Sequence, residues 1–109
     1  MSGAARLDIA EAHIRIVRDI LRAHLPGGAL VWVFGSRAPR RGQTRRARRY
    51  SDLDLAIDAG RRLTSDEAAT LREAFEESDL PYRVDIVDWH AIDERFRRLI
   101  EAERVALAK

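Results

Sequence analysis

The stretch that decides the fold is 51–58, Ser-Asp-Leu-Asp-Leu-Ala-Ile-Asp, in which acidic and apolar residues alternate. An alternation with a period of two is typical of a β-strand, because successive side chains point to opposite faces of the sheet. We therefore expect Asp52 and Asp54 to project together from one face, while Leu53 and Leu55 point the other way. The competing interpretation is an edge strand with one solvated face, since charged side chains are usually exposed.

Periodic segments on both sides of this strand predict the rest of the fold. Apolar residues recur at helical spacing between residues 7 and 25, and the run 29–34 is continuously apolar between glycines. Thr64 precedes Glu67 by three residues, a capping box that predicts the start of a helix. The expected order is helix 7–25, strand 29–34, strand 52–58, helix 64–75, strand 83–88, helix 93–103 and short strand 105–107. Such an order predicts a mixed α/β (α+β) fold, with a small mixed sheet covered by helices.

Length and composition favour one globular domain spanning residues 1–109. The chain is 46% hydrophobic and 35% charged, a mixture that belongs to a folded protein rather than a disordered tail. It contains no cysteine, which excludes a disulfide scaffold, a thiol nucleophile and a cysteine-ligated metal. No stretch approaches the ~20 apolar residues of a membrane span, so we expect a cytoplasmic protein that does not enter the membrane.

The net charge of +2 conceals an uneven distribution. Seven arginines and no acidic residue lie in the segment 37–49, and without them the rest of the chain would carry a charge of −5. This basic loop could neutralise phosphate, bind an acidic partner or touch a nucleic-acid backbone. It could equally be a solvated loop in a chain that uses arginine throughout. No aromatic residue is interleaved before Tyr50, so direct nucleic-acid binding by stacking is not expected.

Two further features suggest phosphate chemistry when they are combined with the paired aspartates. Asp85 interrupts an apolar strand pattern, and if its strand lies beside that of Asp54, three carboxylates converge. Such a trio can hold two divalent ions of the kind that assist phosphoryl and nucleotidyl transfer. Gly35 and Ser36 follow the strand 29–34 directly, and a glycine there lets the backbone turn sharply and approach a ligand.

In this order the three blocks resemble the nucleotidyltransferase superfamily that includes DNA polymerase β. The blocks are Val-Phe-Gly-Ser-Arg-Ala at 33–38, Ser-Asp-Leu-Asp-Leu-Ala-Ile at 51–57 and Val-Asp-Ile-Val at 84–87. Within the superfamily the match is most similar to the minimal nucleotidyltransferase (MNT) domains. The spacing of the three blocks departs from the family pattern at one point: the gap between Ser36 and Asp52 is longer than usual and rich in arginine.

The resemblance implies a site and its cofactors. Gly35 and Ser36 would hold the nucleotide triphosphate, with Arg37 as a further candidate contact. Asp52 and Asp54 would bind two Mg²⁺ ions, and Asp85 would help to hold the ion that activates the attacking hydroxyl. These three aspartates are therefore the expected catalytic and metal-binding residues, with ATP as the substrate.

The resemblance also implies an acceptor. MNT proteins are commonly antitoxins paired with HEPN-domain ribonuclease toxins in type VII-like systems, where AMP from ATP is placed on a toxin tyrosine. The expected elements leave little chain for a separate acceptor domain, which favours an acceptor that is itself a protein, in a hetero-oligomer. The alternatives are a non-catalytic antitoxin that neutralises its partner by binding, a nucleotidyltransferase with another acceptor, and a nucleic-acid-binding module built on the arginine loop.

Overall fold

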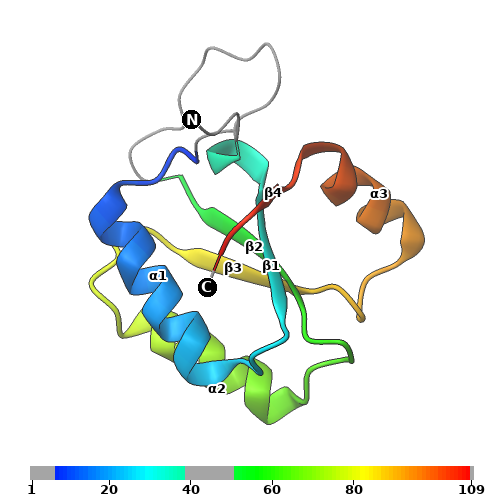
Figure 1. Ribbon diagram of the computed structural model, residues 1–109, viewed down its shortest axis with the longest axis horizontal. Coiled ribbons are helices and arrows are strands. Elements are labelled where there is room, and N and C mark those ends of the chain that lie inside the picture. The colour runs from blue at the N-terminus through cyan, green and yellow to red at the C-terminus, as the bar shows by residue number, and fades with distance from the viewer. Residues whose placement is uncertain (1–6, 39–50, 109) are drawn as a thin grey trace.

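A four-stranded mixed sheet lies at the centre of the computed structural model, which describes residues 7–38 and 51–108. Strands β1 (Leu30–Phe34), β2 (Leu53–Asp58), β3 (Val84–Asp88) and β4 (Val105–Ala106) lie in the order β3-β2-β1-β4 (Figure 1). Strand β1 runs antiparallel to β2 and β4, whereas β2 and β3 are parallel. The expected mixed α/β fold is confirmed, and each expected strand forms within a residue or two of its expected bounds.

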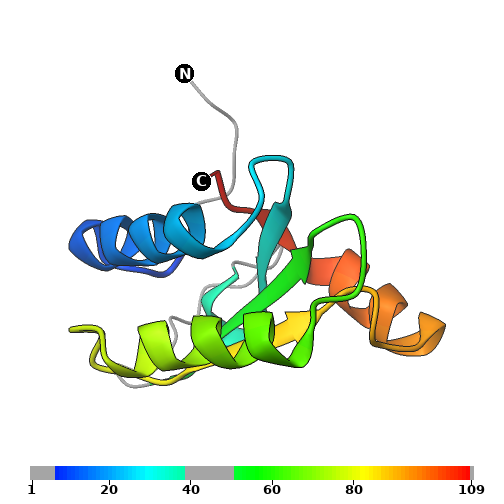
Figure 2. The ribbon, with the colours of Figure 1, turned by 90° about the horizontal axis from the view of Figure 1, so that it is seen from below.

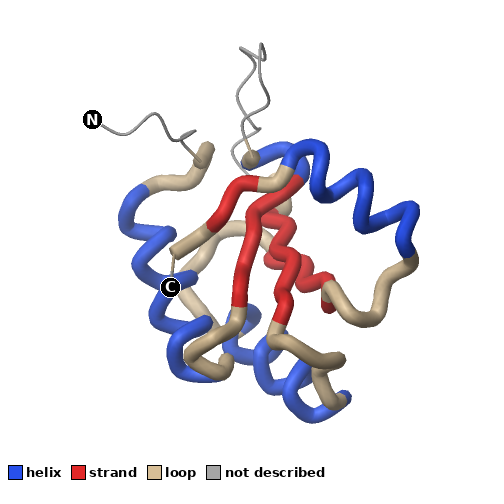
Figure 3. Tube along the Cα trace, turned by 45° about the vertical axis from the view of Figure 1, so that its right-hand side comes forward, coloured by secondary structure: helices blue, strands red, loops and turns tan. Residues whose placement is uncertain are grey.

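Helices cover both faces of the sheet. The helices α1 (Glu11–His24) and α2 (Ser65–Glu76) lie on one side, and α3 (Glu94–Glu103) lies on the other (Figure 2). A tube along the chain shows the strands between these two groups (Figure 3). The parallel pair β2–β3 is joined through α2, as a parallel connection requires.

Two apolar clusters fill the spaces between sheet and helices. The first joins side chains of α1 and α2 to the strand residues Val33, Leu55 and Ile57, which are fully buried. The second is smaller and joins Ile100 of α3 to Phe34, Ala56 and Trp89. The alternation of β2 therefore sends Leu53, Leu55 and Ile57 toward α1 and α2, and sends the intervening residues toward α3.

Helix α3 is attached to the sheet by arginine–tryptophan contacts. The Arg97 side chain donates two hydrogen bonds to the carbonyl of Trp89, at 2.9 and 2.7 Å. The Arg104 guanidinium lies 4.2 Å from the centre of the Trp32 ring. A cation over an aromatic face is stabilising when it is partly removed from water, so these contacts hold the end of α3 near β1.

The first helix is shorter than the sequence predicts. It begins at Glu11, because the residues before it are engaged elsewhere. The backbone N–H of Asp8 donates to the carbonyl of Arg37 at 2.9 Å, and the Arg37 guanidinium donates to the Asp8 carbonyl at 2.9 Å. Leu7 and Ile9 still pack on the first cluster, so the apolar pattern was correct about burial but not about helical conformation.

The predicted start of the second helix is confirmed. Thr64 Oγ1 accepts from the N–H of Glu67 at 3.1 Å, and the Glu67 carboxylate accepts from the N–H of Thr64 at 2.8 Å. Most of the arginine loop, residues 39–50, lies outside the described residues. Within the described ranges, no helix combines the length and the apolar character that crossing a bilayer demands.

Replacement of Leu55 tests the first cluster. Because Leu55 is fully buried, we expect Leu55→Ala to lower the free energy of unfolding by about 2–5 kcal/mol, measured by urea denaturation. The control is Leu99→Ala, since Leu99 is 64% exposed and the expected change is within about 0.5 kcal/mol. Equal effects of the two substitutions would contradict the assignment of the core.

Candidate active site

Asp54 and Asp85 lie directly opposite each other on neighbouring strands. The parallel pairing of β2 and β3 places Asp54 in register with Asp85, and the antiparallel pairing of β1 places Phe34 in register with Asp54. Both carboxylates belong to the face of the sheet that α3 covers, because their strand neighbours pack toward α1 and α2. The hypothesis that the strand of Asp85 lies beside that of Asp54 is confirmed.

Asp52 lies at the entrance to β2. It precedes the first residue of the strand and is exposed to solvent, whereas Asp54 is partly buried. Its charge nevertheless acts on Asp54, two residues along the chain. The two aspartates of the Asp-x-Asp motif thus occupy different environments, one in water and one within the sheet.

The ionised form of Asp54 is disfavoured in the folded chain. Burial, followed by the negative charges of Asp85, Asp52 and Glu103, raises the pKa of Asp54 from 3.8 to about 6. Desolvation and like charges both disfavour an ionised carboxyl group. A cation placed among these carboxylates would relieve the same repulsion.

The backbone turns at Gly35 directly against Asp54. Gly35 has φ +76°, a conformation that favours glycine, and a Cβ atom added there would overlap the Asp54 carboxylate. Ser36 follows in the single helical turn Gly35–Arg37 and is exposed. The predicted Gly-Ser segment therefore lies beside the Asp-x-Asp strand, with its serine accessible.

Arg37 does not join this group. It is 6% exposed, and its guanidinium donates to the carbonyls of Asp8 and Ser51, each at 2.9 Å. The guanidinium also lies 4.0 Å from the centre of the Tyr82 ring. These contacts hold the Arg37 side chain in the interior, next to the turn. The role of Arg37 as a phosphate contact stays a prediction that this position does not favour.

Glu103 is a site residue that the sequence reasoning missed. Its Oε1 atom accepts a hydrogen bond from the N–H of Gly35 at 3.0 Å, across 68 residues of chain. An acidic residue in the last turn of a helix opposes the helix dipole, and Glu103 ends α3. Glu101 lies in the same turn, so this signal alone does not distinguish Glu103.

The donor set of the site suits magnesium. Asp52, Asp54 and Asp85 offer only carboxylate oxygens, which Mg²⁺ prefers. They do not form a closed cage: within residues 7–38 and 51–108, no three His, Asp or Glu side chains already enclose a metal position. Asp85 Oδ1 lies instead 3.0 Å from Nε of the exposed Arg83, so a bound ion would take the place of an arginine as the counter-charge of Asp85.

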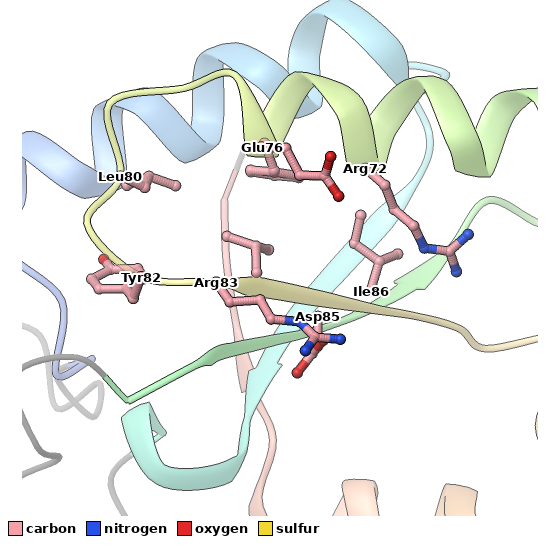
Figure 4. Close-up of a pocket in the computed structure, with 9 residues that line it drawn as sticks. Arg72, Glu76, Leu80, Tyr82, Arg83, Asp85 and Ile86 are labelled. Carbon is pink, nitrogen blue, oxygen red and sulfur yellow. The ribbon is translucent and has the colours of Figure 1, made fainter.

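A cavity of about 540 Å³ lies between α2 and the edge strand β3. Figure 4 shows Leu80, Glu76 and Ile86 on the α2 side of this strand, whereas the carboxylate of Asp85 points to the opposite side. The cavity therefore opens on the face that packs against α2. Asp85 is among the residues that line the cavity, but its carboxylate points to the other side of β3 (Figure 4), so we do not assign the nucleotide to this cavity.

Comparisons with known proteins agree with this geometry. Residues 17–109 match the family model described as polymerase beta, nucleotidyltransferase. A protein of Haemophilus influenzae named probable protein adenylyltransferase MntA is 42% identical over 107 residues, covering 98% of this chain and 89% of the relative.

Solved structures share the fold. A toxin–antitoxin structure with AMP-PNP superposes with a TM-score of 0.69 at 24% identity, over 87% of this chain and 72% of the other. A tri-AMPylated Shewanella oneidensis HEPN toxin in complex with its MNT antitoxin gives a TM-score of 0.60 at 22% identity, over 90% and 71% of the two chains.

Replacement of Gly35 tests the close approach to Asp54. Gly35 and Gly60 both have positive φ, but a Cβ atom at Gly60 meets nothing within 4 Å. We expect both Gly→Ala variants to lose about 1–2 kcal/mol of stability to backbone strain. Gly35→Ala should lose roughly 1–3 kcal/mol more through the overlap, measured by urea denaturation. Equal losses would show that the turn does not press on the carboxylate.

Neutralising Asp54 tests whether its ionised form, which is buried and lies near other carboxylates, opposes folding. Because the pKa of Asp54 is raised to about 6 in the folded chain, the ionised group opposes folding above that pH and has no effect once it is protonated in both states, below about pH 4. We therefore expect Asp54→Asn to raise the thermal midpoint at pH 8 in EDTA, and the gain to vanish toward pH 4.

The control for this experiment is the exposed Asp79, since Asp79→Asn should leave the midpoint unchanged at both pH values. Added Mg²⁺ should stabilise the unmodified protein more than Asp54→Asn. A lower midpoint for Asp54→Asn at pH 8 would contradict the expectation that the ionised Asp54 opposes folding.

Proposed function

Because this chain belongs to the polymerase β nucleotidyltransferase family, we propose that it transfers AMP from ATP to a tyrosine of a HEPN-domain toxin and thereby acts as its antitoxin. The observation that carries the proposal is the placement of Asp54 in register with Asp85, against the turn at Gly35. The Haemophilus influenzae relative, which is named as a protein adenylyltransferase, supports an acceptor that is a protein.

The residues of the site divide into two groups with different roles. Gly35 and Ser36 bring the backbone and one exposed hydroxyl beside Asp54, where they can hold the phosphates of ATP. Asp52, Asp54 and Asp85 would hold two Mg²⁺ ions, which when bound neutralise the phosphates and lower the pKa of the attacking hydroxyl. The negative charges of Asp85, Asp52 and Glu103 around Asp54 support this assignment, since a bound cation would balance them.

The reaction that we propose is an in-line displacement. The acceptor phenol, with a pKa of about 10 in water, gives its proton to the Asp85 carboxylate, and its oxygen attacks the α-phosphorus of ATP. The bond from that phosphorus to the bridging oxygen breaks, and pyrophosphate leaves. The adenylylated tyrosine then carries added bulk and negative charge, which would oppose RNA binding by the toxin. We place this reaction in the cytoplasm, where ATP is held.

A transfer assay tests the proposal. The chain is incubated with Mg²⁺, ATP labelled at the α-phosphate and a cognate HEPN-domain protein, sought first in the adjacent coding sequence. We expect label on the HEPN protein, and a loss of at least a hundredfold in rate with the double variant Asp52→Asn/Asp54→Asn. The exposed variant Asp79→Asn is the matched control and should transfer at the unmodified rate.

The same double variant separates catalysis from binding. An antitoxin that acts only by covering its partner would still neutralise the toxin when both aspartates are amides. Transfer that persists in the double variant, or a folded pair with no label on the partner, would overturn the catalytic proposal.

A further inference from the structure

The carboxylate of Glu103 fixes the peptide plane from which the Gly35 turn begins. Its Oε1 atom lies 3.0 Å from the backbone nitrogen of Gly35, in a partly buried position. A hydrogen bond to this N–H orients the peptide between Phe34 and Gly35, and with it the direction in which the segment Gly35–Arg37 leaves β1. Hydrogen bonds with an ionised acceptor are among the stronger ones in proteins.

The residues that follow Glu103 hold it in place. The next residue, Arg104, closes α3 with a backbone hydrogen bond to Ile100 at 2.8 Å and lies over the Trp32 ring. The chain then continues at once into β4, which pairs with β1. Glu103 and Gly35 are therefore both held to β1, one by the strand that follows it and the other as a direct continuation.

The negative charge of Glu103 adds to the repulsion that acts on Asp54. It is one of the acidic groups that act on Asp54, and it stands at the helix end where a negative charge is unfavourable. A glutamine at this position could accept the same hydrogen bond without either penalty. The bond and the charge can therefore be separated by experiment.

We propose that Glu103 is a positioning residue for the nucleotide: it holds the Gly35–Ser36 turn in the orientation that receives the triphosphate. This inference rests on the proposed function, because it assigns a task to the same site. Glu103 does not itself touch ATP. Its effect on binding passes through the backbone of Gly35.

The experiment compares Glu103→Ala with Glu103→Gln and with Glu101→Ala, an exposed glutamate on the same helix. The dissociation constant for a non-hydrolysable ATP analogue with Mg²⁺ is measured by calorimetry. We expect Glu103→Ala to weaken binding about tenfold, equivalent to ~1.4 kcal/mol, and Glu103→Gln to restore it to within threefold of the unmodified chain. Glu101→Ala should bind as the unmodified chain does.

A second measurement reports the bond without any nucleotide. Hydrogen exchange of the Gly35 amide, followed by NMR, should be slow in the unmodified chain and in Glu103→Gln, and at least tenfold faster in Glu103→Ala. The thermal midpoint of each variant shows whether the fold is intact when these rates are compared.

The outcomes distinguish this inference from the proposed function. If the unmodified chain binds and transfers AMP but Glu103→Ala binds the analogue equally well or more tightly, the positioning role is wrong and the proposed function stands. If Glu103→Gln is as impaired as Glu103→Ala, the hydrogen bond is not what matters and the inference fails. If the unmodified chain neither binds nor transfers, both fail, whatever the exchange of the Gly35 amide.

Discussion

The burial of Asp54 beside other carboxylates, on one face of the sheet, is the constraint that the rest of the structure has to accommodate. Asp54 and Asp85 are held opposite each other by the hydrogen-bonded ladder of β2 and β3. Burial, followed by the negative charges of Asp85, Asp52 and Glu103, raises the pKa of Asp54. The pairing of β2 and β3 withstands the repulsion between these carboxylates because Leu53, Leu55 and Ile57 are fully buried on the other face of the sheet. Their burial contributes roughly 1.5–3 kcal/mol each, enough to hold an unfavourable charge cluster in place.

One face of the sheet therefore supplies most of the apolar packing, and the other face holds the acidic site. The face toward α1 and α2 holds the larger apolar cluster, and stability comes mainly from there. The face toward α3 holds a smaller cluster together with the acidic residues and the Gly35 turn. This separation explains why a site full of like charges does not unfold the domain, since the two sets of side chains lie on opposite faces of the same strands.

The sequence predicted the parts of the site that local patterns encode. The period of two around Asp54, the glycine after an apolar run and an acid inside a strand pattern each point to a position that the structure brings together.

Glu103 was missed because its bond to Gly35 spans 68 residues, and no local period records such a contact. The burial of Arg37 was missed for a similar reason: the carbonyls of Asp8 and Ser51 and the ring of Tyr82 come from three separate segments. The metal-binding and catalytic roles of the three aspartates stay predictions.

The contacts of Arg37 have a consequence for how such a domain can diversify. Its guanidinium bonds to Ser51 just ahead of β2, while its own backbone ends the Gly35 turn, so the two ends of the intervening segment are fastened to each other. The free energy of closing a loop grows only slowly with its length. A change in the length of the segment that joins Ala38 to Ser51 is therefore expected to leave Gly35 and Asp54 in place, because the contact between Arg37 and Ser51 holds the two ends of that segment together.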